Sequence, residues 1–240
     1  MRILITNDDA MHAPQLVPLI RWWQKVGEVT AVVPKFEQSG KSHGIEIHKP
    51  FEAKQVELAP GITAWAVDST PADCVRFAIL GLHMEFDLVI SGINKGLNIG
   101  SDIMYSGTVS AVLEAHALGC KAIALSTPPE YYSQAVSQLD RVWAYVTEQK
   151  LLDTHPLYNI NIPADPKAIR ITHQGGPYFT DDFIPIGNDM YSPHGYSIYA
   201  DRQDDNLDTD AVMHGHISIM PLTTDKTDYN AYNALAHLNV

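Results

Sequence analysis

The chain has 240 residues and a formal net charge of −12, and its composition is 45% hydrophobic and 18% charged. This length suits one large α/β domain, and the acidic balance argues against nucleic acid or an anionic membrane as the main partner. The apolar runs are far shorter than the roughly 20 residues needed to cross a bilayer. Cys74 and Cys120 lie in apolar segments outside any CxxC motif, which predicts buried, reduced thiols in a cytoplasmic protein.

Residues 1–163 alternate short β-rich runs with segments of helical spacing, which predicts a parallel, doubly wound sheet with helices on both faces. The expected strands cover 2–6, 28–33, 45–51, 62–67, 86–91, 121–126 and 157–163. The expected helices cover 15–26, 71–82, 107–119 and 131–150, and an unstructured loop is expected over 92–106. Thr70 is expected to cap the second helix, with Pro71 in its first turn.

The alternation ends near residue 167. Short β-like runs over 168–174, 195–200 and 215–220 then alternate with Pro, Gly and Asp clusters, which predicts hairpins that project from the core. We therefore expect one domain over 1–240, with a core over 1–167 and a hairpin and tail extension over 168–240. The tail carries an apolar stripe at helical spacing, which must dock on a neighbouring subunit or on its own domain. The stripe consists of Tyr229, Tyr232 and Leu235.

An acidic pair, Asp8-Asp9, ends the first expected strand. Adjacent carboxylates repel each other and are costly to bury, so either solvent or a cation must offset that cost. One interpretation is a pair of hard oxygen ligands for Mg²⁺ or Mn²⁺. The other is an exposed turn in which one aspartate caps the following helix.

Two further polar clusters follow strand ends, where doubly wound sheets bind ligands. The stretch SGKS at 39–42 is not a P-loop, because Lys35 stands where that motif needs Gly; it leaves Ser39 in a flexible loop or a plain turn. The long loop carries Asn94 and Asn98 and ends at an expected helix start. That helix start is either an anion site or a simple N-cap. Its residues are Ser106, Gly107 and Thr108.

Other polar residues carry a weaker signal. His214 and His216 have a spacing that zinc can use, but no third nitrogen or sulfur ligand lies nearby, so zinc is not predicted. An acidic segment is expected to be a solvated face rather than a calcium site. It contains Asp201, Asp204, Asp205, Asp208 and Asp210.

Taken in order, several motifs resemble those of the SurE family of survival-protein phosphatases over nearly the whole chain. They are MRILITNDDA, EQSG, STPADCV, DLVISGINKGLNIGSDIMYSGTVSAVLEA, GCKAIALS, NINIP and DTDAVMHGHISIMPL. The resemblance implies a Rossmann-like three-layer sandwich and hydrolysis of nucleoside 5′- and 3′-monophosphates or other small phosphomonoesters by an acid phosphatase. It also implies homodimers or homotetramers that exchange their C-terminal hairpins or tails.

The resemblance also implies roles for particular residues. The metal ligands of the family, for Mg²⁺ or Mn²⁺, match Asp8, Asp9, Ser39 and Asn94. The phosphate-side residues match Asn98, Ser106, Gly107 and Thr108, and Asp8 is expected to act in catalysis as a base or a nucleophile. Two departures are Ala10, where the family usually has Gly, and the divergent stretch over 183–205.

Two other functions remain open at this point. One is a metal- and nucleotide-binding regulatory protein that keeps the pocket without turnover. The other is a metal-dependent glycosyltransferase, although no segment is apparent that would supply its acceptor domain. The residues do not distinguish 5′ from 3′ substrates, water from Asp8 as nucleophile, or dimer from tetramer.

Overall fold

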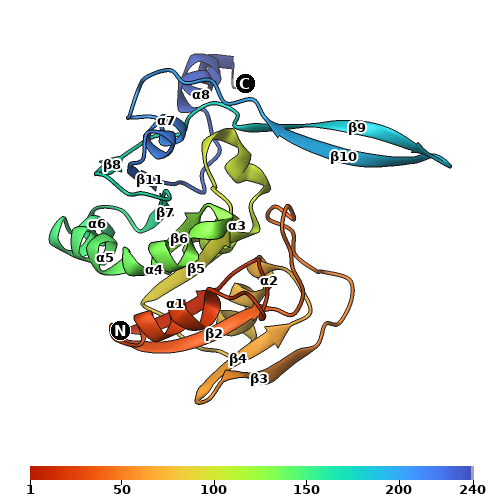
Figure 1. Cartoon of the computed structure of the whole chain (residues 1–240), viewed down its shortest axis with the longest axis vertical. Coiled ribbons are helices and arrows are strands. Elements are labelled where there is room, and N and C mark those ends of the chain that lie inside the picture. Colours follow the sequence, from red (N-terminus) through yellow and green to blue (C-terminus); the bar gives the residue numbers. More distant parts are fainter. Residues whose placement is uncertain (239–240) are drawn as a thin grey trace.

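The computed structural model describes residues 1–238, and its centre is a nine-stranded sheet with helices on both faces (Figure 1). In chain order its strands are β1 Arg2–Thr6, β2 Glu28–Pro34, β3 Ala53–Ala59, β4 Ile62–Val67, β5 Leu88–Lys95, β6 Lys121–Thr127, β7 Leu157–Asn161, β8 Ile169–Ile171 and β11 Ile217–Pro221. Across the sheet they lie in the order β3-β4-β2-β1-β5-β6-β7-β11-β8. The strands from β4 to β7 run parallel, whereas β3 and the β11–β8 pair run the other way. The predicted doubly wound, mostly parallel sheet is confirmed.

The strand order reverses beside β1. Strands β2 and β4 lie on one side of β1, and β5, β6 and β7 lie on the other. In such sheets the reversal opens a crevice beyond the carboxyl ends of the strands. The residues that follow β1 and β5 are therefore brought to the same edge of the sheet.

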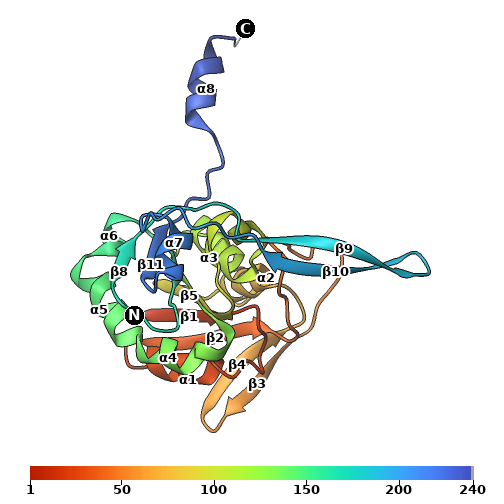
Figure 2. The same ribbon diagram turned by 45° about the horizontal axis from the view of Figure 1, so that its top comes forward.

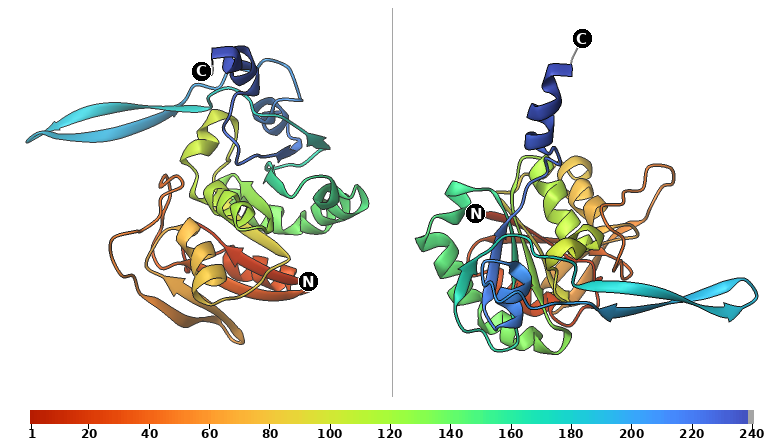
Figure 3. Two further views of the ribbon diagram at one scale, coloured as in Figure 1. Left: turned by 180° about the vertical axis from the view of Figure 1, so that it is seen from behind. Right: turned by 90° about the horizontal axis from the view of Figure 1, so that it is seen from above.

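Helices cover both faces of the sheet (Figure 3), and an apolar layer fills the space between sheet and helices on each face. The helices are α1 Leu16–Trp23, α2 Pro71–Arg76, α3 Gly107–Ala117, α4 Tyr132–Ser137, α5 Leu139–Glu148, α6 Leu151–Thr154, α7 Asp208–Met213 and α8 Tyr229–Leu235. One layer packs α1, α4 and α5 against one face of the sheet, and the other packs α2 and α3 against the opposite face. Cys74 and Cys120 are buried and free, as predicted. Among residues 1–238, no helix is long and apolar enough to span a membrane.

Three predicted elements differ from the structure. Residues 45–51 form a loop instead of a strand: Pro50 cannot donate a ladder bond, and β3 is the strand that pairs with β4. The helix expected over 131–150 is divided into α4, α5 and α6, with breaks at Gln138 and at Lys150, which has φ of 52°. The expected loop over 92–106 is partly regular, because β5 runs to Lys95 and a 3₁₀ helix covers Gly100–Tyr105.

Beyond residue 167 the prediction holds only in part. The strands β9 Phe179–Gly187 and β10 Met190–Ser197 form a hairpin that projects from the body (Figure 2). By contrast, β8 and β11 complete the main sheet, so the prediction that they project is wrong. The reason is burial, because Ile217 and Ile219 are fully enclosed in the core. The single domain over 1–240 remains a prediction.

Candidate active site

Asp8 and Asp9 lie at the switch point, directly after β1. The chain turns immediately behind them: Ala10 has φ of 68°, and Asn7 Nδ2 donates to the Ala10 carbonyl at 3.0 Å. Glycine adopts a positive φ readily and alanine does not, so Ala10 makes this turn at a conformational cost. The turn allows both carboxylates to meet the segment that follows β5, which neighbours in an extended strand would not do.

Asp8 is 3% exposed and contacts the start of α3. The Thr108 hydroxyl donates to Asp8 Oδ1 at 2.5 Å, and the Asp8 carbonyl accepts from the Gln38 backbone N–H at 2.8 Å. Burial raises the pKa of Asp8, and the Thr108 hydroxyl and nearby backbone N–H groups offset this only in part. A side chain at Gly107 would crowd Asp8, because a Cβ would lie 3.0 Å from Asp8 Cβ and 3.2 Å from Asp8 Oδ2.

Asp9 is held through one of its two oxygens. Gln15 Nε2 and the Lys95 backbone N–H donate to Asp9 Oδ2 at 2.8 and 2.9 Å. Within the described part of the chain, these recorded bonds leave Asp9 Oδ1 without a donor. Burial and the neighbouring charge of Asp8 raise the pKa of Asp9 to about 6. Two neighbouring carboxylates in this environment repel each other, and a bound cation would offset that repulsion.

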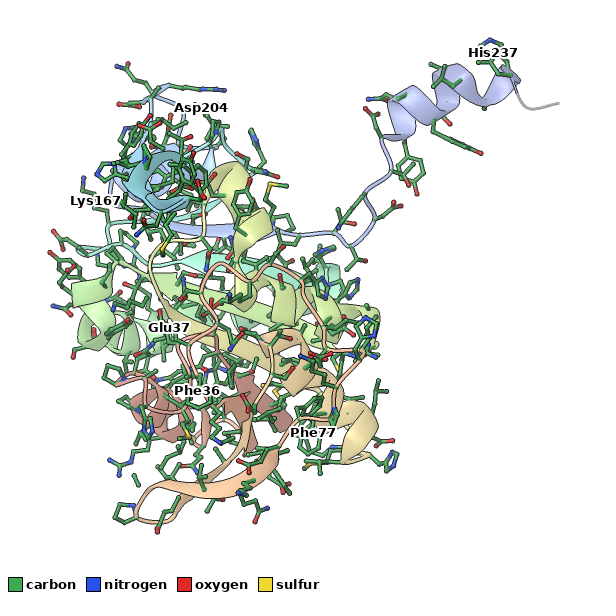
Figure 4. The ribbon with its side chains drawn as sticks, turned by 90° about the vertical axis from the view of Figure 1, so that its right-hand side faces the viewer. Phe36, Glu37, Phe77, Lys167, Asp204 and His237 are labelled. Carbon is green, nitrogen blue, oxygen red and sulfur yellow. The ribbon has the colours of Figure 1, made fainter. Side chains whose placement is uncertain are left out.

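The remaining predicted ligands flank this pair. Asn94 is 9% exposed, and its Nδ2 donates to the Gly96 carbonyl at 2.9 Å, so its Oδ1 is the atom left for a ligand. Ser39 is exposed on the loop after β2, and its hydroxyl donates to Glu37 Oε1 at 2.9 Å (Figure 4 labels Glu37 on this loop). Ser39 therefore stands at the rim and does not itself contact the carboxylate pair.

The start of α3 acts both as a cap and as a source of donors. Ser106 Oγ accepts from the Val109 N–H at 3.1 Å, so the N-cap interpretation is confirmed for Ser106. Thr108 is not the cap, because it lies inside α3 as its second residue, and its hydroxyl donates to Asp8 Oδ1. The Ser106 hydroxyl proton and the N–H of Gly107, which has no partner inside the helix, remain available to an anion.

Asn98 belongs to a buried polar network on the far side of β5. Its Nδ2 donates to Ser126 Oγ at 2.8 Å, and its backbone N–H donates to Asn161 Oδ1 at 2.8 Å. The Asn98 carbonyl accepts from the amides of both Asn159 and Asn161. One hydrogen of the Asn98 amide is thus engaged, and the other is left for a ligand.

Three residues at the site were missed by the sequence reasoning. Gln15 binds Asp9 directly, and the charge of Glu37 raises the pKa of Asp8 and Asp9. Burial, and then the charges of Asp9 and Asp8, raise the pKa of the Tyr132 hydroxyl. The only available signal was for Glu37, which stands two residues before Ser39 inside the motif EQSG.

The donor set fits a hard divalent cation such as Mg²⁺ or Mn²⁺. Within residues 1–238, no three His, Cys, Asp or Glu side chains gather as a metal cluster, so two carboxylates must be supplemented by neutral oxygens. Mg²⁺ is commonly bound in this way, through one or two carboxylates and several waters. One neutral oxygen near the pair is Asn94 Oδ1. A second is Ser39 Oγ, which would have to turn away from Glu37 to reach a cation.

The prediction of a solvated acidic face near the C-terminus holds only in part. Asp201 is exposed, and Asp204 and Asp205 are half-buried. Asp208 and Asp210 are instead fully buried, and backbone N–H groups of the surrounding loops donate to their carboxylates. His214 and His216 each contact Asp205, at 2.6 and 3.3 Å.

The fold and the site together define a doubly wound α/β protein with adjacent carboxylates at the switch point, the deeper of which contacts a helix N-terminus. The chain belongs to the SurE family, whose model, described as "Survival protein SurE", matches residues 3–181. It is 35% identical over 248 residues to the 5′-nucleotidase SurE of Petrotoga mobilis, covering 98% of each chain. It is 39% identical over 251 residues to the 5′-nucleotidase SurE of Geotalea uraniireducens, again covering 98% of each. The crystal structure of the SurE protein from Aquifex aeolicus is similar in fold, with a TM-score of 0.77 and 28% identity over 99% of both chains.

Proposed function

We propose that the chain is a divalent-metal-dependent phosphomonoesterase that hydrolyses nucleoside 5′- and 3′-monophosphates to nucleoside and phosphate. The observation that carries the proposal is the Asp8–Asp9 pair at the switch point of the sheet, with Asp8 buried against the N-terminus of α3 and Asp9 partly exposed beside it. The names of the relatives, which match this chain over almost its full length, support the same substrate class.

Asp8, Asp9 and Asn94 would hold Mg²⁺ or Mn²⁺, with Ser39 at the rim. When bound, the cation supplies positive charge that polarises the phosphate oxygens and offsets the charge that develops on them. The Gly107 N–H, the Ser106 hydroxyl and the free amide hydrogen of Asn98 would donate to those oxygens and fix the position of phosphorus.

Asp8 is the proposed proton acceptor for the attacking water. Its raised pKa brings it nearer to the working pH of a general base, and Thr108 fixes its orientation. A carboxylate nucleophile is the alternative. A single turnover in ¹⁸O-water separates the two, because label in the Asp8 carboxylate would exclude direct attack by water, whereas label in the phosphate alone supports it.

The function is tested by phosphate release from 5′-AMP and 3′-AMP with Mn²⁺, with and without a chelator. We expect release that the chelator abolishes and that excess Mn²⁺ restores. A protein that binds Mn²⁺ and nucleotide but releases no phosphate from any monophosphate would instead be a regulatory binding protein.

The two free, buried thiols favour a cytoplasmic location.

We also propose that the chain forms homodimers or homotetramers. Every residue of β10 is exposed, and the exposed apolar residues of the hairpin include Phe183, Ile186 and Tyr191. An exposed apolar patch of this kind marks a contact surface.

A further inference from the structure

Gln15 is almost fully enclosed beside the proposed metal site, at 1% exposure. It stands at the N-terminus of α1, but its side chain makes no capping bond there. Instead, Gln15 Nε2 donates to Asp9 Oδ2 at 2.8 Å and to the Ile93 carbonyl at 2.7 Å. The Gln15 side chain thus hydrogen-bonds to residues of the site and does not cap its own helix.

The amide can take only one orientation in this position. Both partners of Nε2 are oxygen acceptors, so a flipped amide would set its own oxygen against a carboxylate and a carbonyl. Within the described residues, Gln15 Oε1 is buried without a hydrogen-bond partner. Burying an unpaired amide oxygen costs free energy, which indicates that the two bonds of Nε2 decide the placement of this residue.

The two bonds join the segments that carry the proposed ligands. Asp9 follows β1, whereas Ile93 directly precedes Asn94 in β5. Gln15 therefore sets the distance between one carboxylate ligand and the strand that bears the amide ligand. The Lys95 N–H binds the same oxygen of Asp9, so Oδ2 is pinned twice and Oδ1 is directed elsewhere.

We propose that Gln15 is a positioning residue that presents Asp9 Oδ1 to the divalent cation and fixes Asp9 relative to Asn94. This inference rests on the proposed function. The neutral amide suits the role, because it holds a carboxylate without adding a positive charge that would repel the cation. Partners that orient metal ligands in this way are typically worth about 10- to 100-fold in metal affinity.

The test is the substitution Gln15→Met, which keeps an unbranched side chain of similar length and removes both donors. Mn²⁺ binding is measured from the electron paramagnetic resonance signal of free Mn²⁺. We expect the Kd for Mn²⁺ to rise about tenfold or more. At saturating Mn²⁺ we expect the KM for 5′-AMP to stay within about twofold, since Gln15 does not face the substrate.

The matched control is Gln24→Met on the exposed end of the same helix, which should leave the Kd unchanged. If Gln15→Met binds Mn²⁺ as tightly as the unchanged protein, the inference about Gln15 is wrong while the proposed function stands. If the unchanged protein binds no Mn²⁺, the proposed function and the inference both fall.

A measurement on the unchanged protein covers the case in which Gln15→Met does not fold. The side-chain amide resonances of Gln15 and Gln24 are followed by NMR during titration with Mg²⁺, which is diamagnetic. We expect the Gln15 amide to shift with the same midpoint as the Asp9 backbone, and the Gln24 amide to stay constant. A Gln15 amide that does not respond at saturating Mg²⁺ would overturn the proposal.

Discussion

Asp8 and Asp9 are chemically identical neighbours that the structure places in different surroundings. Asp8 is nearly inaccessible and contacts a hydroxyl and backbone amides at the start of α3, whereas Asp9 is partly exposed and is held by Gln15 and Lys95. The deeper carboxylate lies next to the proposed phosphate donors, and the outer one faces the rim. This difference supports the proposal that Asp8 serves in catalysis and metal binding, and Asp9 in metal binding alone.

The substitution Asp8→Asn should nearly abolish phosphate release while the fold stays intact. The side chain keeps its size, but the charge that binds the cation and accepts the proton is lost. We expect kcat to fall about a hundredfold or more, roughly 3 kcal/mol. Asp189→Asn at the hairpin turn is an exposed control. Turnover like that of the unchanged protein at limiting Mn²⁺ would remove Asp8 from the site.

Thr108→Val tests the division between metal and phosphate. The family resemblance places Thr108 on the phosphate side, but in the structure the Thr108 hydroxyl donates its one proton to Asp8 in a hydrogen bond. Loss of a hydrogen bond to a charged group costs about 1.5–3 kcal/mol, so we expect Mn²⁺ affinity and turnover both to fall about tenfold or more. The exposed Thr147→Val serves as control. Unchanged Mn²⁺ affinity with reduced turnover would return Thr108 to the phosphate.

Gly107→Ala should impair the site with little loss of stability. An added Cβ would lie 3.0 Å from Asp8 Cβ and 3.2 Å from Pro71 Cγ, so Asp8 must move by a few tenths of an ångström. Small displacements of a catalytic group are costly, and we expect turnover to fall about tenfold. Kinetics and thermal unfolding are measured together. A variant with normal turnover would show that Asp8 adjusts freely.

Sequence reasoning pointed to Asp8, Asp9 and the start of α3, because they follow a strand end or open a helix. It also pointed to Asn94, which it placed just beyond a strand that in the structure continues to Lys95. It missed Gln15, whose side chain joins Asp9 to the Ile93 carbonyl. That pair of contacts has no local signature in the chain. The link from Asn98 to Ser126 and Asn161 was equally invisible, since it joins residues 28 and 63 positions apart.

At the scale of elements, local pattern was sufficient for the parallel strands at the centre of the sheet. The segment over 45–51 alternates like a strand, yet it has no partner, and Ile47 is 70% exposed. For β8 and β11 the error is the opposite one. These strands are short and flanked by turn residues, and they were expected to project, but they pair at the edge of the main sheet. Pairing partners, which are distant in sequence, decided both cases.

The tail forms a helix whose side chains are not buried by the rest of the chain. Helix α8 extends away from the body and has no buried residue, and Figure 4 shows His237 at its outer end. Tyr229, Tyr232 and Leu235 are each more than half exposed. The tail therefore does not pack on its own domain, which leaves a neighbouring subunit as the proposed partner.

Deleting the tail after Leu222 should weaken subunit association and leave the core folded. The core loses no buried contact of α8, whereas the partner loses an apolar stripe. Sedimentation and thermal unfolding of the shortened chain measure the two effects. In the full chain, Tyr232→Ser with Leu235→Ser should act in the same direction. A shortened chain that keeps its oligomeric state but unfolds at a lower temperature would contradict the proposal.

For the whole molecule, the proposed metal and the pH should act together on stability. The unfolded chain titrates Asp9 near its usual pKa of 3.8, but the folded chain does so at about 6. Between these values the folded state keeps a proton that the unfolded state has lost, so stability falls as pH rises. The pKa of Glu114 is lowered from its usual 4.5, mainly by His43, so its contribution is present at pH 5 and above and is lost only as pH falls below about 4.5. The pKa of His214 is raised by Asp205 and Asp201, and its contribution also weakens with rising pH.

We therefore expect the metal-free protein to resist urea better at pH 5 than at pH 7.5. The variant Asp9→Asn keeps His214 but lacks the titrating carboxyl at position 9. The urea midpoint of this variant should therefore change less between the two pH values than that of the unchanged protein, and the difference reports on Asp9. Mg²⁺ should raise the midpoint of the unchanged protein clearly at pH 7.5 and little at pH 5, because a protonated carboxyl binds the cation poorly. Asp9→Asn should respond weakly to Mg²⁺ at both values. Equal stabilisation by Mg²⁺ at pH 5 and pH 7.5 would show that Asp9 does not titrate in the metal site.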